Sequence, residues 1–251
     1  MSDPALSVRG LRKKFGGLQA VRGVTLSVDS GSITALIGPN GAGKTTLFHM
    51  ISGFVRPDAG SVHFDGSDIT GLAPHLVCRR GMTRTFQIVQ PFAGQTVREN
   101  IAVGAHLHLR GRAEALEEAE RVALRVGLGS RLDMPAAGLT IASRKRLELA
   151  RALATRPRML LLDEVLAGLN PHEIAEVLPL VRSIRDAGTT VLMIEHVMQA
   201  VMNLAERVFV LANGELIAEG RPREVTDDPK VIEAYLGHGA AERLKTGAAR
   251  A

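Results

Sequence analysis

Gly38-Pro39-Asn40-Gly41-Ala42-Gly43-Lys44-Thr45 is the stretch that decides the fold, because it fits the pattern G-x-x-x-x-G-K-[ST] of a phosphate-binding loop. An unbroken apolar run, Ile33–Ile37, precedes it, and a helix-like stretch with Leu47, Met50, Ile51 and Phe54 follows it. A buried strand, a glycine-rich loop and a helix in this order form the setting in which the pattern binds phosphate. The sequence therefore predicts a nucleotide-binding protein of the α/β class.

Each residue type in this loop has a chemical role. Glycines let backbone N–H groups curl around phosphate oxygens, and the following helix directs its N-terminal dipole at the anion. Lys44 adds positive charge for the β- and γ-phosphates, and Thr45 offers a hydroxyl to Mg²⁺. We expect ATP to contact the loop residues Gly38, Pro39, Asn40, Gly41, Ala42, Gly43, Lys44, Thr45 and Thr46.

Two acids follow a second apolar strand. Met159–Leu162 is continuous and apolar, and Asp163 and Glu164 come directly after it. Acids at the carboxyl end of a parallel strand lie where α/β proteins bind ligands. We expect Asp163 to hold Mg²⁺ through water and Glu164 to polarise the water that attacks the γ-phosphate.

The rest of the chain predicts a largely parallel sheet, because short apolar strands alternate with helical stretches. Asn213-Gly214 suits the type I′ turn of a C-terminal hairpin. The further predicted strands are Val24–Val28, Val62–Phe64 before a turn at Asp65-Gly66, Val191–Ile194, Val208–Leu211 and Leu216–Ala218.

The middle of the chain has a different pattern. From about Gln87 to Thr155 the sequence is helical, highly charged and without a clear strand, including a short charged segment over residues 110–125. It predicts a helical subdomain over residues 87–155, inserted between core segments 1–86 and 156–237. Residues 238–251 are rich in Gly, Ala and charge, so we expect a frayed tail.

Composition bounds the classes of function. The chain has 251 residues, 45% of them hydrophobic and 23% charged, which excludes a disordered protein. Lys and Arg minus Asp and Glu give 31 − 26 = +5, which favours an acidic partner such as a nucleotide. A single cysteine, Cys78, excludes an intramolecular disulfide and a cysteine-built zinc site. No signal peptide and no apolar run of membrane-spanning length is found, so we expect a soluble, cytoplasmic protein.

With these motifs the chain resembles the ATP-binding subunit of an ABC transporter, from about Leu6 to Gly237. The resemblance implies a RecA-like P-loop core with N-terminal antiparallel strands and an inserted helical subdomain. It implies that Phe15 stacks on adenine and that Gln87 contacts Mg²⁺ and water. It also implies that His196, after the strand Val191–Ile194, contacts the γ-phosphate.

The family's signature loop corresponds to Leu139–Ser143. The resemblance implies that Thr140 contacts, in trans, the ATP bound to the opposite subunit of a dimer. Ile141 and Ala142 stand where the family has glycines, and Ile141 cannot adopt a positive φ without strain. This departure leaves open whether the loop supports full hydrolysis, and whether the dimer is symmetric.

Three details are similar to the larger ATPase of branched-chain amino acid importers: Arg84–Gln87, Ala167–Pro171 and Ala234–Gly237. The resemblance implies transmembrane permease subunits and a second ATP-binding subunit as partners, with a periplasmic binding protein acting indirectly. It implies a peripheral location on the cytoplasmic face of the inner membrane, and no nucleic acid is expected.

Three alternatives remain at this point. A lipid or lipopolysaccharide exporter ATPase differs only in its membrane partner. A non-transport ABC ATPase acting on nucleic acid or ribosomes usually has two ATP domains or a long coiled-coil insertion, and this chain has neither. A regulatory subunit that hydrolyses ATP poorly is favoured by Ile141 and Ala142, and opposed by Lys44, Asp163, Glu164 and His196.

Overall fold

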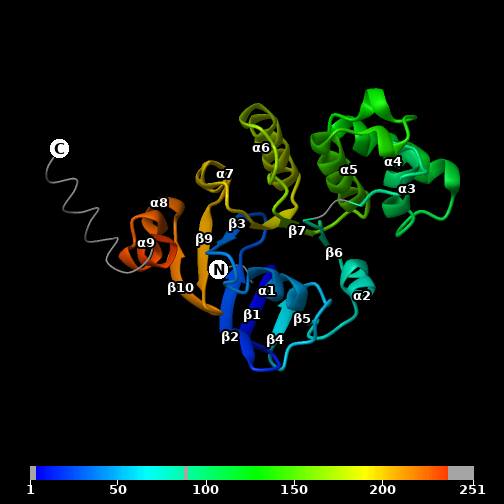
Figure 1. Cartoon of the computed structure of the whole chain (residues 1–251). Helices are drawn as coiled ribbons and strands as arrows, with labels where there is room; N and C mark the ends of the chain where they lie inside the picture. Colours follow the sequence, from blue (N-terminus) through cyan, green and yellow to red (C-terminus); the bar gives the residue numbers. More distant parts are fainter. Residues whose placement is uncertain (1–3, 88–89, 237–251) are drawn as a thin grey trace, which may run out of the picture. The chain divides into compact units, whose positions relative to one another are not determined.

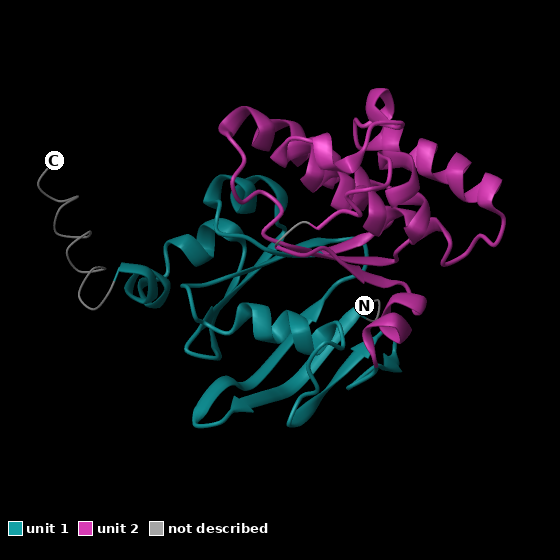
Figure 2. Cartoon of the chain, turned by 45° about the vertical axis from the view of Figure 1, so that its right-hand side comes forward, with its two compact units in different colours: residues 1–72, 192–251 teal, residues 73–191 magenta. Residues whose placement is uncertain are grey.

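The structure is a computed structural model that describes residues 4–87 and 90–236. The chain divides into two compact units, residues 1–72 with 192–251, and residues 73–191 (Figure 2). We call them unit 1 and unit 2 and describe each by itself, with the elements labelled as in Figure 1. The predicted tail, residues 238–251, lies outside the described residues.

An antiparallel sheet forms the first part of unit 1, with strand order β2-β1-β4-β5. Its strands are β1 (Leu6–Phe15), β2 (Leu18–Val28), β4 (Ala59–Phe64) and β5 (Ser67–Asp68). Val24, Leu26 and Val28 are buried while Thr25 is exposed, which confirms the predicted alternation. Strand β2 begins six residues earlier than predicted, because the residues from Leu18 to Arg22 also pair with β1. The N-terminal antiparallel strands implied by the family resemblance are therefore present.

The second part of unit 1 contains the strand that leads into the glycine-rich loop. Strand β3 (Ile33–Ile37) is buried throughout and pairs in parallel with β9 (Arg207–Ala212), which forms a hairpin with β10 (Glu215–Gly220). Asn213 and Gly214 have φ of 49° and 83°, which confirms the predicted turn. The helices of this unit are α1 (Lys44–Ile51), α7 (Met198–Leu204), α8 (Pro222–Thr226) and α9 (Pro229–Leu236).

Unit 2 carries the strand that ends in the two acids. Strand β7 (Met159–Asp163) is buried throughout and pairs in parallel with β6 (Met82–Arg84). Strand β6 was not predicted, since three residues are too few to show a periodic pattern. Helices α2 (Pro74–Arg79) and α6 (Pro171–Asp186) belong to the same unit, and β8 (Thr190–Ile194) crosses the boundary to unit 1.

Three helices of unit 2 confirm the predicted helical insertion: α3 (Val97–Ala105), α4 (Arg112–Arg125) and α5 (Ile141–Ala154). They pack on one another, and the described part of residues 87–155 contains no strand. A Cβ atom on Gly104 of α3 would lie 2.3 Å from the carbonyl oxygen of Arg151 on α5, so glycine permits this close approach. Most of the charged residues of α4 lie on its exposed face, and its buried residues are Ala115, Glu118, Ala119, Val122 and Ala123.

Across the described ranges, the structure has no helix with the length and apolar character needed to cross a bilayer.

Candidate functional site: a phosphate loop and a pair of carboxylates

The predicted phosphate loop lies in unit 1 between β3 and α1. Gly38 and Gly43 have φ of 149° and 102°. A Cβ atom would lie 2.0 Å from the carbonyl oxygen of Leu211 at Gly38, and 2.4 Å from that of Ala20 at Gly43. Both positions therefore require glycine, for backbone conformation and for space. Gly43 is also the N-cap of α1, so the positive end of this helix begins at the loop.

Lys44 is held against the loop that precedes it. Its Nζ donates to the carbonyl oxygens of Gly38 at 2.7 Å and Pro39 at 3.0 Å, and the residue is buried. Thr45 is exposed and Thr46 half-buried in the first turn of α1. The loop thus combines an ammonium group, a hydroxyl group and a helix N-terminus, the groups that bind phosphate and its cation.

The C-terminal hairpin supports the same loop. The backbone N–H of Gly214 donates to the carbonyl oxygen of Ala42 at 3.0 Å, and the carbonyl oxygen of Gly214 accepts from the N–H of Arg22 at 2.8 Å. The Asn-Gly pair predicts the turn, but its contact with the phosphate loop joins residues far apart in the sequence.

Two residues assigned by resemblance also belong to unit 1. Phe15 ends β1 with 47% of its surface exposed, and Lys13 Nζ lies 5.5 Å from the centre of its ring. An exposed ring suits stacking on a flat ligand. His196 is exposed and follows β8 by two residues. Stacking of Phe15 on adenine and contact of His196 with the γ-phosphate stay predictions.

The two acids in unit 2 have different surroundings. Asp163 is buried and forms an ion pair with Arg84, with Nη2 to Oδ2 at 2.6 Å. Glu164 is half-buried and has φ of 49°, a left-handed conformation that is costly for a residue with a side chain. The sequence did not indicate the Arg84–Asp163 pair, because its two members are 79 residues apart.

Gln87 lies against the second of these acids. Its Nε2 donates to Glu164 Oε2 at 2.7 Å. A carboxylate only accepts hydrogen bonds, so the amide nitrogen faces Glu164 and the amide oxygen remains for another ligand. Gln87 and Glu164 are thus brought together within unit 2, where Asp163 precedes Glu164 in the chain, whereas the phosphate loop and His196 belong to unit 1. Their roles stay predictions.

The predicted signature loop begins helix α5. Thr140 is exposed and is the N-cap, and its Oγ1 accepts from the N–H of Ser143 at 3.3 Å. Ile141 is the first residue of the helix and is not among the described non-glycine residues with positive φ. A helix that starts here needs no left-handed residue, so isoleucine in place of the family's glycine brings no backbone strain at this position. The loop therefore presents a helix N-terminus at Thr140 without the family's glycines.

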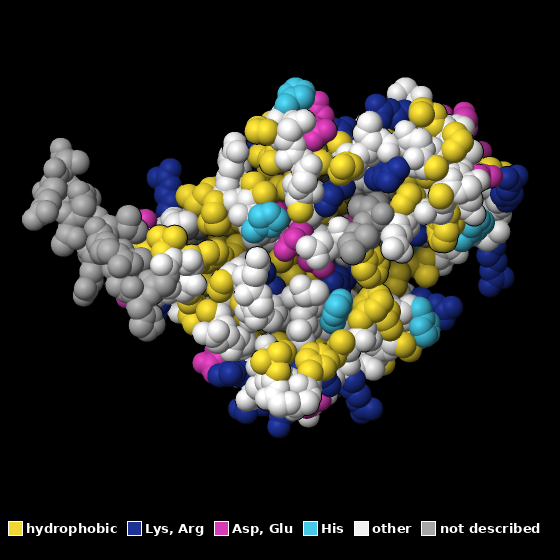
Figure 3. Space-filling view, in the orientation of Figure 1, with side chains coloured by type: hydrophobic (Ala, Val, Ile, Leu, Met, Phe, Trp, Pro, Cys, Tyr) yellow, Lys and Arg dark blue, Asp and Glu magenta, His cyan; other side chains and the backbone are white. Residues whose placement is uncertain are grey.

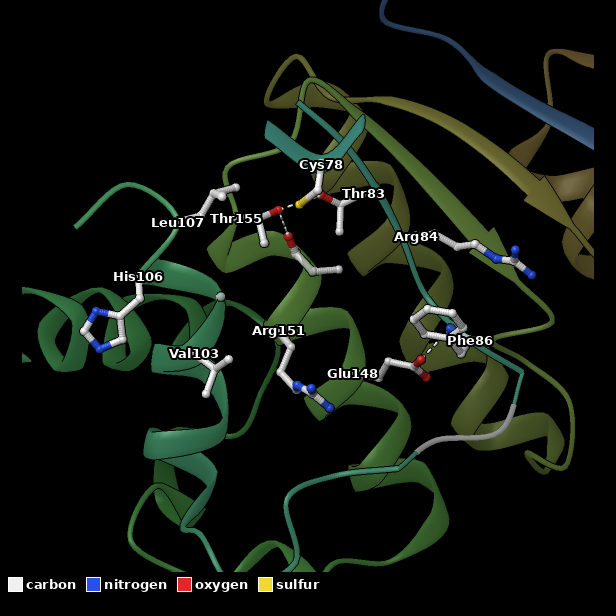
Figure 4. A pocket seen from close by; sticks show the side chains of 12 residues that line it. Cys78, Thr83, Arg84, Phe86, Val103, His106, Leu107, Glu148, Arg151 and Thr155 are labelled. Carbon is white, nitrogen blue, oxygen red and sulfur yellow. Dashed lines mark hydrogen bonds between the residues drawn. The ribbon is translucent and has the colours of Figure 1, made fainter. Parts of the chain in front are cut away.

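A pocket of about 470 Å³ lies wholly within unit 2, between residues of α3, α5 and the segment that leads to Gln87 (Figure 4). Its lining combines apolar groups with Arg84, Glu148 and Arg151. Glu148 is buried, and its carboxylate accepts from the backbone N–H of Phe86. Burial raises the pKa of Glu148 from its ordinary value of 4.5 to about 7, against the opposing effect of that hydrogen bond and of Lys145 and Arg151.

Glu148→Gln is expected to raise the free energy of unfolding at pH 8 by about 1–3 kcal/mol. In the wild type, the unfolded chain releases the Glu148 proton near pH 4.5 while the folded chain keeps it until about pH 7, so stability is lost as the pH rises through this window. Glutamine removes the titration. Urea unfolding followed by circular dichroism at pH 5.5 and pH 8 measures the difference, with Glu117→Gln on the exposed face of α4 as control. An equal gain at both pH values would contradict the expectation.

The basic residues around α5 serve contacts inside the protein. Arg144 donates to the carbonyl oxygen of Ala137, Arg158 to that of Arg80, and Arg156 pairs with Glu118. Arg146 pairs with Glu176 of α6. On the face drawn in Figure 3, Lys and Arg side chains are dispersed rather than gathered into one stripe. These contacts favour a structural role for Arg144, Arg146, Arg156 and Arg158.

The described residues hold no group of three or more His, Cys, Asp and Glu arranged to bind a metal ion. The predicted cation ligands are of another kind: a threonine hydroxyl, an amide oxygen and a single carboxylate.

A strand, phosphate loop and helix in one unit, and a strand that ends in Asp-Glu beside a glutamine in the other, define a nucleotide-binding P-loop ATPase of the cassette type. The model of the family described as "ABC transporter" matches residues 21–167, and that described as "Branched-chain amino acid ATP-binding cassette transporter" matches residues 215–241. The chain belongs to the ABC transporter family and is one of its ATPases.

Curated relatives match along almost their whole length. The chain is 42% identical to the high-affinity branched-chain amino acid transport ATP-binding protein BraF of Pseudomonas aeruginosa, and 40% identical to LivG of Escherichia coli K12, which bears the same description. Both matches cover 94% of this chain and 99% of the relative.

Solved structures agree with the fold. A nucleotide-free ATP-binding cassette from an ABC transporter has a TM-score of 0.86 and 34% identity, over 94% of this chain and 100% of that one. A cassette in its ADP conformation gives the same values. The predicted fold class, an α/β P-loop ATPase with N-terminal antiparallel strands, is confirmed.

Proposed function

We propose that the chain is the ATP-hydrolysing subunit of an importer for branched-chain or chemically related amino acids. The observation that carries this proposal is the 42% identity to BraF over 94% of the chain. The match of residues 215–241 to the branched-chain amino acid cassette family adds support from a segment that contains none of the proposed ATP or Mg²⁺ ligands.

In the proposed reaction, residues of unit 1 bind ATP. Phe15 stacks on the adenine, and the loop Gly38–Thr46 binds the phosphates with Lys44 neutralising their charge. Glu164 accepts the proton of the attacking water, and His196 stabilises the γ-phosphate as it leaves. We also propose two domains: an ATP-binding core of residues 1–86 and 156–237, and a helical subdomain of residues 87–155.

Mg²⁺ fits the oxygen donors that these residues supply. It prefers hard oxygen ligands, and Thr45 has a hydroxyl, Gln87 an amide oxygen directed away from Glu164, and Asp163 a second carboxylate oxygen beside the one that binds Arg84. When bound, the cation neutralises phosphate charge during phosphoryl transfer. We propose these three residues as its ligands.

We further propose a head-to-tail dimer with a second ATP-binding subunit, identical or different. Thr140 and the N-terminus of α5 then contact the ATP of the opposite subunit. The exposed N-cap supports this role, because the first N–H groups of a helix bind anions. Transmembrane permease subunits are the partners that transmit the motion, on the cytoplasmic face of the membrane, with a periplasmic binding protein acting through them.

The test is isolation of the complex from its native membrane, followed by reconstitution into liposomes. We expect two multi-span membrane proteins and a second small ATPase to co-purify. We also expect ATP-dependent uptake of labelled leucine that unlabelled isoleucine and valine reduce and lysine does not. Co-purified ribosomal or DNA-associated proteins, or uptake of none of these amino acids, would contradict the proposal. Near-zero ATPase rates in both the isolated chain and the complex would favour the regulatory alternative.

A further inference from the structure

Helix α5 contacts Glu164 and the residue before Gln87, the two ends of the segment pair joined by the Gln87–Glu164 hydrogen bond within unit 2. Lys145 Nζ donates to the backbone carbonyl oxygen of Glu164 at 2.9 Å. Glu148, three residues later on the same face, accepts the backbone N–H of Phe86, the residue before Gln87 (Figure 4). Because Gln87 donates to Glu164, these contacts close a ring that starts and ends on α5.

We propose that Glu148 is a positioning residue for ATP hydrolysis: by fixing the backbone of Phe86, it holds the Gln87 amide against the Glu164 carboxylate. The inference rests on the proposed roles of Gln87 and Glu164. Glu148 itself touches neither nucleotide nor water in this mechanism and acts through the backbone of the neighbouring segment.

The segment around Gln87 depends on α5 for its position. Phe86 and Gln87 are both exposed, so little burial of their own side chains fixes them. Besides Glu148 at Phe86, Arg151 donates from the same face of α5 to the carbonyl oxygen of Gln90 at 3.1 Å. Two side chains of one helix, a turn apart, thus hold the backbone on either side of Gln87.

The backbone of Glu164 also needs stabilising contacts, because its φ of 49° is costly for a residue with a side chain. Its carbonyl oxygen accepts from the N–H of Ala167 at 3.1 Å as well as from Lys145. Helix α5 therefore fixes the backbone of Glu164 through Lys145 and the backbone before Gln87 through Glu148. The same helix therefore positions the backbone near both side chains of the Gln87–Glu164 hydrogen bond, which is 2.7 Å long.

For the hydrogen bond with Phe86, the length of the side chain at position 148 matters more than its charge. A glutamine keeps the length of the side chain and an oxygen that accepts from Phe86, whereas an aspartate keeps the charge and is one methylene shorter. Glu148→Gln should therefore preserve the ring of contacts, and Glu148→Asp and Glu148→Ala should open it.

The test measures steady-state ATP hydrolysis by the full-length chain and by the membrane complex that contains it. We expect Glu148→Ala and Glu148→Asp to lower kcat about tenfold with KM for ATP changed less than twofold, since misplacement of a catalytic group by about 1 Å has effects of this size or larger. Glu148→Gln should stay within about twofold of wild type. Glu117→Gln on α4 is the matched control and should hydrolyse ATP normally.

A double-mutant cycle with Gln87→Ala separates positioning from a general loss of structure. If Glu148 acts through Gln87, Glu148→Ala lowers kcat by less than about twofold in the Gln87→Ala background. An equal tenfold loss in both backgrounds overturns the inference, and so does a loss with Glu148→Gln as large as with alanine. If Glu148→Ala does not fold, the same comparison is made with Glu148→Asp.

Failure of the inference is distinguishable from failure of the proposed function. If Glu164→Gln abolishes hydrolysis while the cycle is additive, only the positioning role of Glu148 is overturned. If Glu164→Gln hydrolyses ATP at the normal rate, the proposed reaction is overturned, and with it the basis of the inference.

Discussion

Glu164→Gln lowers the rate of ATP hydrolysis by at least about 100-fold, because an amide cannot accept the proton of the attacking water and a general base supplies about 10²–10⁴-fold. The substitution keeps the size and shape of the side chain, so ATP binding is retained. Since hydrolysis is the step proposed to reopen the dimer, the variant accumulates in the closed, ATP-bound form.

Measured quantities for this variant are the release of inorganic phosphate, the Kd for a fluorescent ATP analogue, and the molecular mass with and without ATP. Glu215→Gln on the exposed part of β10 is the control and leaves all three unchanged. A wild-type rate of phosphate release would show that another group is the base. A loss of ATP binding together with hydrolysis would mean that the amide disturbs the fold.

Lys44→Ala weakens binding of ATP by about 100-fold or more, because the loop loses its charge toward the β- and γ-phosphates and charge-assisted contacts of this kind contribute about 1.5–3 kcal/mol each. Hydrolysis is lost with binding. The same change leaves the carbonyl oxygens of Gly38 and Pro39 without their Lys44 donor, so the loop itself also loosens.

Isothermal titration with ATP and Mg²⁺ measures this effect, and the thermal unfolding midpoint shows how much of it is structural. Lys230→Ala on α9, where the side chain is exposed, removes one positive charge elsewhere and serves as the control. An unchanged Kd for Lys44→Ala would mean that the loop is not the phosphate site. If both variants weaken binding equally, overall charge is responsible rather than Lys44.

Local patterns predicted much of the fold. The hairpin at Asn213-Gly214 was predicted because few residue pairs adopt positive φ twice in succession. The strand Ile33–Ile37 was predicted to its end residues because a continuous apolar run before a glycine-rich loop leaves few alternatives. Strand β6 was missed because it has three residues and is defined by its pairing with β7 rather than by a pattern of its own.

The candidate site divides in the same way. All residues of the phosphate loop could be named from the sequence, since the motif consists of eight consecutive residues. Whether Ile141 has to adopt a positive φ could not be predicted from sequence, and the structure begins a helix there, which needs none. No role was predicted for Glu148, because the sequence shows it only as one acid on a charged helix. Its burial and its contact with Phe86 are visible only in the structure.

The sequence by itself determined the class of this protein: a phosphate loop, an acid pair after an apolar strand, and a helical insertion between them. These features depend on residues close together in the chain, where backbone preference and side-chain periodicity act directly. Only the tertiary structure decided which groups meet: Arg84 with Asp163, Gln87 with Glu164, and Glu148 with the backbone of Phe86. These pairs are separated by 62 to 79 residues, and their contact follows from the packing of α5 and the pairing of β6 with β7, which no local pattern specifies.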